Sequence, residues 1–209
     1  MKVAVLDIKG KETGRTVELA DSIFGIEPNN HALYLDVKQY LANQRQGTHK
    51  SKERAEISGS TRKIKKQKGS GTARAGSIKS PLFKGGGRVF GPRPKDYSFK
   101  LNKSLKRLAR KSALSLKVKE QNLIVLENFN FETPKTKNLI EVLKTFSLTD
   151  KKSMFVFGES NNNVYLASRN LTRTNVVSAS SLNTYNLVNT NKLILIESAL
   201  EEIEINLNK

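Results

Sequence analysis

Residues 57–95 constrain most strongly what this chain can fold into. They contain no Asp or Glu, 11 Lys or Arg, and 8 of the chain's 13 glycines. Their few large apolar residues follow neither the 3.6-residue period of a helix nor the two-residue period of a strand. Burial of such side chains cannot offset the entropy lost on ordering the backbone. The segment is therefore either disordered or ordered by a partner that supplies the missing contacts.

The positive charge of the chain is concentrated around this segment. The 209 residues include 37 basic and 19 acidic ones, which gives a net charge of +18. Residues 45–119 hold 23 of the basic and 3 of the acidic residues, so the remainder of the chain is slightly acidic. A field of this size favours a polyanionic partner, nucleic acid before an acidic membrane.

Composition and the N-terminus exclude several classes of protein. The chain has no cysteine, which excludes disulfides, thiolate zinc sites and cysteine nucleophiles. The start MKVAVLDIKG lacks the apolar run and cleavage site of a signal peptide, and no run of about 18 apolar residues occurs. We expect a cytoplasmic protein with no membrane partner and no bound metal.

The flanks of the basic segment have the patterns of a folded domain. Apolar runs of strand length alternate with helical patterns, as in a mostly parallel sheet covered by helices. The expected strands are 3–8, 16–19, 123–126, 154–157, 176–178 and 193–196, and the expected helices are 29–44, 103–118, 134–146, 164–171, 183–188 and 198–207. Thr133 followed by Pro134 predicts a helix start, and Ser198 with Glu201 predicts a capping box.

This alternation predicts one discontinuous α/β domain with an insertion. Residues 1–44 and 105–209 form the globular part, and residues 45–104 form a long extended basic loop between them. With roughly 30 residues in each arm and about 3.3 Å per residue, the loop could reach on the order of 90 Å. A large folded RNA has interiors deep enough for such an arm, whereas duplex DNA offers only grooves.

The sequence contains no complete nucleotide-binding motif. The spacing of Gly71, Gly76 and Ser77 resembles a P-loop without its lysine, and no strand pattern precedes it. The pair Gly69 and Gly71 could open a dinucleotide fingerprint, but Arg74 stands where the third glycine belongs. We expect no nucleotide cofactor.

Catalytic constellations are also missing from the sequence. His31 is expected at a helix start or on the surface, and His49 lies among basic residues and is expected to contact a phosphate. We expect the carboxylates near the C-terminus, Glu201, Glu202 and Glu204, to lie on a solvent-exposed helix face. We expect no enzyme, no catalytic residue, no cofactor and no small-molecule substrate.

The chemistry of the basic segment matches nucleic acid, and RNA in particular. Lys and Arg neutralise phosphates and release counterions. Glycines let the backbone approach closely. Flat side chains, namely Phe83, Phe90, Tyr97 and Phe99, can stack on unpaired bases.

Several stretches closely resemble the bacterial large-subunit ribosomal protein four family. They are Arg45-Gln46-Gly47-Thr48, Arg54-Ala55-Glu56, Gly59-Ser60, QKGSGTARAGSIKSP at 67–81, Pro134-Lys135-Thr136-Lys137 and Ala167-Ser168-Arg169-Asn170-Leu171. The resemblance covers essentially the whole chain, and the block at 67–81 is its most specific part. It implies a Rossmann-like α/β body on the large ribosomal subunit and an extended loop that threads through ribosomal RNA to the nascent-peptide exit tunnel.

The resemblance also implies the partners and the site residues. The partners are large-subunit ribosomal RNA, neighbouring large-subunit proteins and the nascent polypeptide, and the role includes assistance to subunit assembly. The candidate RNA-binding residues are Arg45, Gln46, Gly47, Thr48, Lys50, Arg54, Arg62, Lys63, Lys65, Lys66, Gln67, Lys68, Gly69, Gly71, Arg74, Gly76, Lys79, Phe83, Lys84, Arg88, Phe90, Arg93, Lys103, Lys106, Arg107 and Arg110. The tip expected to face the tunnel is Arg62, Lys63, Ile64, Lys65, Lys66, Gln67 and Lys68.

One departure from the family pattern falls at this tip. Ile64-Lys65 occupies the place where the bacterial pattern usually has Pro-Trp, so any contact that depends on the indole is replaced by a more cationic surface. Two alternatives remain open at this stage. The chain could be a free RNA-binding regulator or RNA chaperone, or a nucleotide-dependent RNA-modifying enzyme that uses the α/β body.

Overall fold

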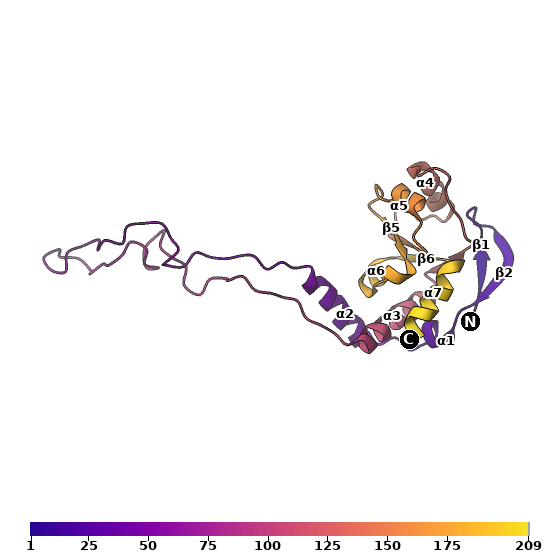
Figure 1. The fold of residues 1–209 in the computed structure, drawn as a ribbon, viewed down its shortest axis with the longest axis horizontal. Coiled ribbons are helices and arrows are strands. Elements are labelled where there is room, and N and C mark those ends of the chain that lie inside the picture. Colours follow the sequence, from indigo (N-terminus) through magenta and orange to yellow (C-terminus); the bar gives the residue numbers. More distant parts are fainter. Residues whose placement is uncertain (209) are drawn as a thin grey trace. The chain divides into compact units, whose positions relative to one another are not determined.

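The computed structural model describes residues 1–208 and contains a six-stranded mixed sheet with helices on both faces (Figure 1). The strands are β1 (Lys2–Leu6), β2 (Glu12–Glu18), β3 (Leu123–Leu126), β4 (Ser153–Phe157), β5 (Thr174–Ser178) and β6 (Lys192–Ile196). The helices are α1 (Asp21–Phe24), α2 (Asn30–Asn43), α3 (Lys103–Lys119), α4 (Thr136–Thr145), α5 (Asn162–Ser168), the short 3₁₀ helix η1 (Ala179–Ser181), α6 (Thr184–Asn189) and α7 (Glu197–Asn208). The expected α/β class with a mostly parallel sheet is confirmed.

The sheet has the order β2-β1-β3-β6-β4-β5. Five strands are parallel, and β2 pairs antiparallel with β1 at one edge. The register places Val125 of β3 beside Val5 of β1 and Leu195 of β6. This order differs from the 3-2-1-4-5-6 order of a dinucleotide-binding domain, so the Rossmann-like description is not confirmed.

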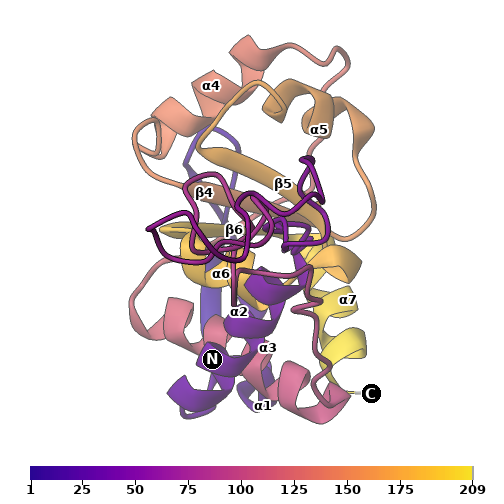
Figure 2. The same cartoon turned by 90° about the vertical axis from the view of Figure 1, so that its left-hand side faces the viewer.

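Two hydrophobic layers pack on the sheet, one on each face. Helices α4 and α5 cover one face, where Leu139 and Val164 are buried, and α1, α3, α6 and α7 cover the other, where Leu114 and Ile203 are buried (Figure 2). Parallel strands covered on both faces need apolar side chains in both directions, which explains the near-continuous apolar runs of β4 and β6. No member of either layer comes from residues 42–99.

Two predicted helix starts are wrong. The N-cap of α4 is Lys135 instead of Thr133, because the N–H of Lys135 donates to the carbonyl of Thr133 (2.8 Å) and forms a turn before the helix. Helix α7 begins at Glu197 directly after β6, so Ser198 is already helical. Its N–H donates to Oδ1 of Asn128 (3.2 Å), so a side chain from another loop replaces the predicted capping box.

The chain divides into two compact units. The first comprises residues 1–41 and 100–209, and the second comprises residues 42–99. The boundaries expected from the sequence were 44/45 and 104/105. Among residues 1–208, no helix combines the length and the apolar content needed to cross a membrane.

A buried lysine on α3 connects this helix to the end of α6 on the same face of the sheet. The Nζ of Lys117 donates to the carbonyl of Thr190 at the end of α6 (2.7 Å), and the side chain is only 6% exposed. Burial lowers the pKa of Lys117, and the nearby carboxylate of Glu120 opposes this shift. Charged groups are buried at a cost unless they are paired, so this contact replaces the water that the ammonium loses.

We predict that Lys117→Ala lowers the free energy of unfolding by about 1–3 kcal/mol, because the Thr190 carbonyl loses its donor. The native pKa lies below the unfolded one, so the unfolded state binds more protons just below the ordinary lysine pKa. Stability of the parent chain should therefore rise with pH in that window, and this component should disappear in Lys117→Met. Chemical denaturation at several alkaline pH values measures both effects. An unchanged pH profile in Lys117→Met would contradict the assignment.

Candidate nucleic-acid interface

The second unit, residues 42–99, doubles back on itself without forming strands. Between the end of α2 at Asn43 and residue 99, no helix or strand occurs. Backbone hydrogen bonds join its two halves at separated points. They run from Lys95 N–H to Gly47 O (3.1 Å), from Ser51 N–H to Pro92 O (2.9 Å), from Arg88 N–H to Lys52 O (2.9 Å) and from Ile64 N–H to Gly76 O (2.8 Å). The two halves therefore lie side by side, although they lack the regular ladder of a β-hairpin.

Glycines in this unit lie in two kinds of surroundings. At Gly47, φ is +63° and an added Cβ would lie 2.0 Å from the carbonyl oxygen of Lys95 on the other half. At Gly87, a Cβ would lie 2.4 Å from the backbone nitrogen of Arg54. Both positions need glycine for contact between the halves and not for approach to a ligand. Around Gly69 and Gly71, by contrast, no other atom lies within 4 Å of the position of an added Cβ.

The reversal of chain direction lies slightly beyond the expected tip. The hydrogen bond between Ile64 and Gly76 encloses residues 65–75, with positive φ at Gly69 and Gly71. The reversal is thus centred near Ser70, whereas the predicted tip spans residues 62–68. Ile64 is 44% exposed.

The acidic residues near the start of this unit pair with candidate RNA-binding cations. Glu53 pairs with Arg93 across the two halves, and Glu56 pairs with Lys50. The hydrogen bond from Lys50, followed by that from the Glu53 backbone N–H, lowers the pKa of Glu56. Lys50 and Arg93 thus already have carboxylate partners within the unit.

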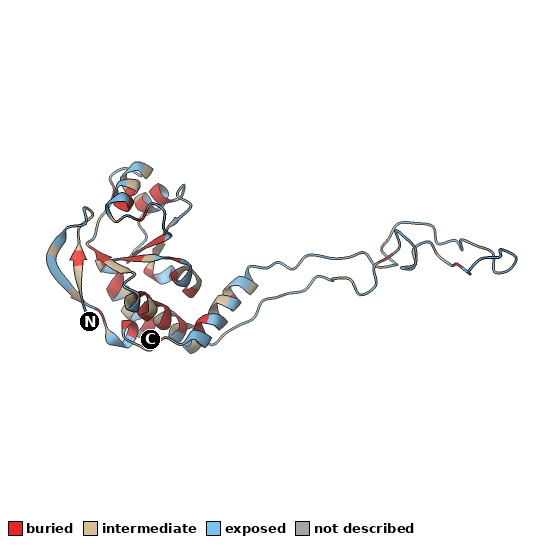
Figure 3. Ribbon diagram, turned by 180° about the vertical axis from the view of Figure 1, so that it is seen from behind, coloured by how far each residue is buried: buried red, intermediate tan, exposed pale blue. Residues whose placement is uncertain are grey.

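Most of the other candidate cations have no such partner. No ion pair or hydrogen bond with residues 1–208 is made by the side chains of Arg54, Arg62, Lys66, Lys68, Arg74, Lys79, Lys84 or Arg88. Lys63 bonds to Gln67, and Lys65 donates to the hydroxyl of Thr72 (2.8 Å). Gln46 and Thr48 are exposed. The colouring by burial shows this unit almost entirely as exposed surface (Figure 3).

The aromatic residues of the unit divide into free and engaged ones. Phe90 is fully exposed and has a left-handed backbone with φ of +52°, and Phe83 is 38% exposed. Tyr97 is engaged within the unit, because the guanidinium of Arg45 lies 3.8 Å from its ring centroid and its hydroxyl lies 3.4 Å from Nε2 of His49. Tyr97 is therefore a poorer stacking surface than predicted.

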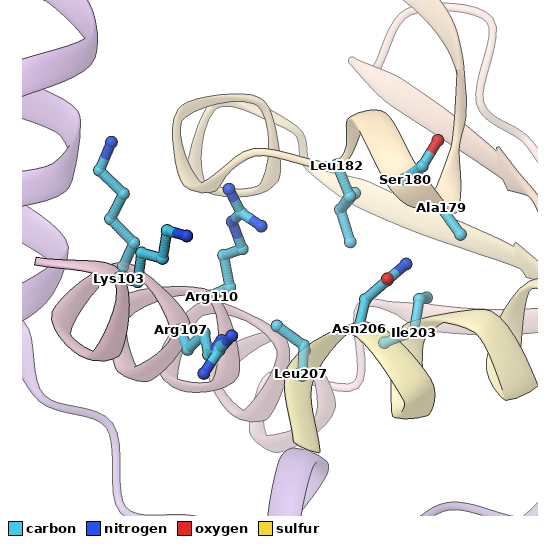
Figure 4. A pocket seen from close by; sticks show the side chains of 10 residues that line it. Lys103, Arg107, Arg110, Ala179, Ser180, Leu182, Ile203, Asn206 and Leu207 are labelled. Atoms are coloured by element: carbon cyan, nitrogen blue, oxygen red, sulfur yellow. The ribbon is translucent and has the colours of Figure 1, made fainter. Parts of the chain in front are cut away.

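A second group of candidate cations lies in the first unit, on α3. Lys103, Lys106, Arg107 and Arg110 share one helical face because they are spaced three or four residues apart. They line a cavity of about 260 Å³ (Figure 4). Six further residues complete the lining, namely Ala179, Ser180, Leu182, Ile203, Asn206 and Leu207. Ser180 and Asn206 are polar, and the other four are apolar and form the floor of the cavity.

Sequence patterns gave no indication of these six further residues. They come from η1, the turn after it and α7, and nothing in their local sequence distinguishes them from ordinary core or surface positions. Only the packing of α3 against α7 and η1 brings them to the cationic face of α3.

The carboxyl ends of β3, β4 and β6 border a different hollow of about 620 Å³. Ligands of open α/β sheets commonly bind at this edge. The lining here is rich in Asn and includes Glu159, Glu201 and Glu202, with no Lys or Arg. Such a lining offers no counter-charge to phosphates, so the hollow does not favour nucleotide chemistry. Among residues 1–208, no cluster of His, Asp and Glu could hold a metal ion.

Comparison with known proteins agrees with the resemblance seen in the sequence. Residues 17–206 match the Ribosomal protein L4/L1 family. The Large ribosomal subunit protein uL4 of Flavobacterium johnsoniae is 72% identical over 209 residues, and that of Flavobacterium psychrophilum is 70% identical over 209 residues. The protein of the same name from Christiangramia forsetii is 67% identical over 208 residues. All three alignments cover 100% of both chains. The chain therefore belongs to the Ribosomal protein L4/L1 family, a family of structural proteins and not of enzymes.

Proposed function

We propose that this chain is a structural protein of the large ribosomal subunit in the bacterial cytoplasm. In this role, the 42–99 unit acts as an extended loop that binds ribosomal RNA, assists subunit assembly and reaches the nascent-peptide exit tunnel. The cationic face of α3 forms a second RNA contact. Neighbouring large-subunit proteins are further partners, and the nascent polypeptide meets the reversal at residues 65–75.

One observation carries this proposal. Of residues 42–99, only Ala75 and Gly87 are buried, and the side chains of eight cations in this unit make no ion pair or hydrogen bond with residues 1–208. A long segment with so little buried apolar surface gains its stability from a partner. Unpaired Lys and Arg on a backbone without secondary structure favour a partner with closely spaced phosphates.

Exposed aromatic surface favours RNA with unpaired bases over a regular duplex. Phe90 is fully exposed between Arg88 and Arg93, and its left-handed backbone is an uncommon conformation for a non-glycine residue. Sequence-specific RNA recognition commonly stacks splayed-out bases on such rings. A free RNA chaperone would use the same chemistry, so location in the cell distinguishes the two functions.

We predict that Phe90→Ala weakens binding to large-subunit ribosomal RNA by about tenfold, since one stacked base contributes about 1–3 kcal/mol. The salt dependence should stay nearly unchanged because no charge is removed. Leu82→Ala is the matched control, because Leu82 is also an exposed apolar side chain of this unit (91%) but has no ring to stack. Filter binding at several salt concentrations measures both variants. Equal losses in the two variants would show that Phe90 does not stack on a base.

The proposal as a whole is tested by incorporation into ribosomes. A tagged full-length chain should sediment with large subunits in stoichiometric amount and resist a high-salt wash. Replacement of residues 65–75 by Asn-Gly keeps the flanking Ile64–Gly76 hydrogen bond and shortens the reversal. This variant should still enter large subunits. A photo-crosslinker at Gln67 of the otherwise unchanged chain should label nascent chains.

Two outcomes would count against parts of the proposal. If the full-length chain is found free of large subunits, it is a regulator or chaperone and not a ribosomal component. If the shortened variant fails to enter large subunits, the reversal anchors the protein and does not simply face the tunnel.

A further inference from the structure

The cavity beside α3 has features that a general phosphate contact does not explain. Its rim is cationic, but its floor is formed by buried apolar side chains, including Leu182 (4% exposed), Ile203 (1%) and Leu207 (5%). A phosphate alone would leave this apolar floor unused. An apolar floor suits the face of a nucleobase, which is the apolar part of a nucleotide.

Three of the four cations at the rim form no ion pair with the described residues. Lys103, Lys106 and Arg110 make no ion pair with any residue from 1 to 208. The Nε of Arg110 is buried and has no hydrogen-bond partner in the described chain. Buried donors in native proteins are nearly always satisfied, so an orphaned one indicates an acceptor that the protein does not supply. A phosphate oxygen or a base carbonyl near Arg110 would supply it after a small shift of the side chain.

Asn206 adds a polar side chain to the lining that can recognise the edge of a base. The amide of Asn206 on α7 carries both donors and an acceptor, as the edge of a base requires. In Figure 4, the side chain of Asn206 rises from α7 toward Leu182, and that of Arg110 rises from α3 beside Leu182. The cavity, at about 260 Å³, has room for a single base.

We infer that this cavity binds one unstacked nucleotide of RNA, with the base on the apolar floor and its phosphate at the α3 cations. The inference rests on the proposed RNA-binding function and adds a specific requirement to it. A base can enter only if it leaves the helical stack, so the first unit recognises a bulge, a loop or another unpaired nucleotide and not a regular duplex.

Two RNA hairpins of identical stem sequence test this inference with the full-length chain. One hairpin is fully paired, and the other carries a single unpaired 2-aminopurine, with parallel versions that carry A, C, G or U. We expect binding to at least one bulged hairpin to be about tenfold tighter than to the paired one. The fluorescence of the 2-aminopurine should change on binding, because the base moves from water into the cavity.

Three variants assign the preference to this cavity. Ser180→Trp should fill its mouth, and Arg110→Gln should remove the buried donor, so each should reduce the bulged-to-paired affinity ratio to about one. Lys119→Gln is the matched control, since it removes a cation of α3 that does not line the cavity. It should weaken binding to both hairpins equally and keep the ratio. Thermal unfolding confirms that each variant is folded, and Arg110→Gln keeps the test valid if the bulkier substitution is not tolerated.

The outcomes separate this inference from the broader proposal. If the parent chain binds paired and bulged hairpins equally for every base, or if the preference survives in Arg110→Gln, the inference is overturned while RNA binding stands. If the parent chain binds neither the hairpins nor large-subunit ribosomal RNA, the proposed function itself is overturned. A photo-crosslinker at Ser180 should label unpaired nucleotides of large-subunit ribosomal RNA, and labelling of a protein instead would also refute the inference.

Discussion

A chain in which residues 44–98 are replaced by a four-residue Gly-Ser linker should still unfold in one cooperative transition. It should nevertheless bind large-subunit ribosomal RNA about a thousandfold more weakly, because many phosphate contacts are lost together. The linker can be short, since the N–H of Phe99 donates to Oδ1 of Asn43 (3.2 Å) and the two ends therefore lie close together. Every residue of the two hydrophobic layers remains in the shortened chain.

The shortened chain should be at least as stable as the full-length protein. Each halving of a flexible loop lowers its closure cost by about 0.6 kcal/mol, so a reduction from 55 to 4 residues, nearly four halvings, stabilises the native state by about 2 kcal/mol. Calorimetry of both proteins measures this difference, and filter binding measures the affinity. Loss of the cooperative transition would mean that residues 44–98 belong to the core, contrary to the burial seen here.

Neutralising four unpaired cations of the 42–99 unit should flatten the salt dependence of RNA binding. The variant changes Arg54, Arg74, Lys79 and Arg88 to Gln, and none of these has an ion pair within the described chain. Each lost phosphate contact reduces the slope of log affinity against log salt by about 0.7–0.9. The full set should thus reduce the magnitude of the slope by about 3 and weaken binding by at least a hundredfold at 0.1 M salt.

The matched control carries the same change in net charge on the first unit. It changes Lys135, Lys137, Lys144 and Lys151 to Gln, which are exposed and make no ion pair among residues 1–208. If RNA affinity depended only on net charge, both variants would lose the same slope. A slope that responds equally to the two sets would refute a localised interface in the 42–99 unit.

The sequence by itself determined the class of the fold and the unusual character of the central segment. Apolar runs of strand length, such as 154–157 and 193–196, are visible because strands buried on both faces must be apolar in both directions. The lack of a core-forming pattern in 57–95 is equally local information. The family resemblance also depends on sequence alone, and the match of residues 17–206 confirms it.

Other features depended on contacts between residues distant in the chain. The sheet order and the start of α7 follow from neighbours such as Asn128, whose side chain accepts from Ser198. The engagement of Tyr97 by Arg45 and the need for glycine at 47 arise only when the two halves of the 42–99 unit meet. The cavity floor is the clearest case. Leu182 and Leu207 look like ordinary core residues in sequence, and only packing places them beneath the cations of α3, because side-chain contacts across 70 or more residues leave no local pattern.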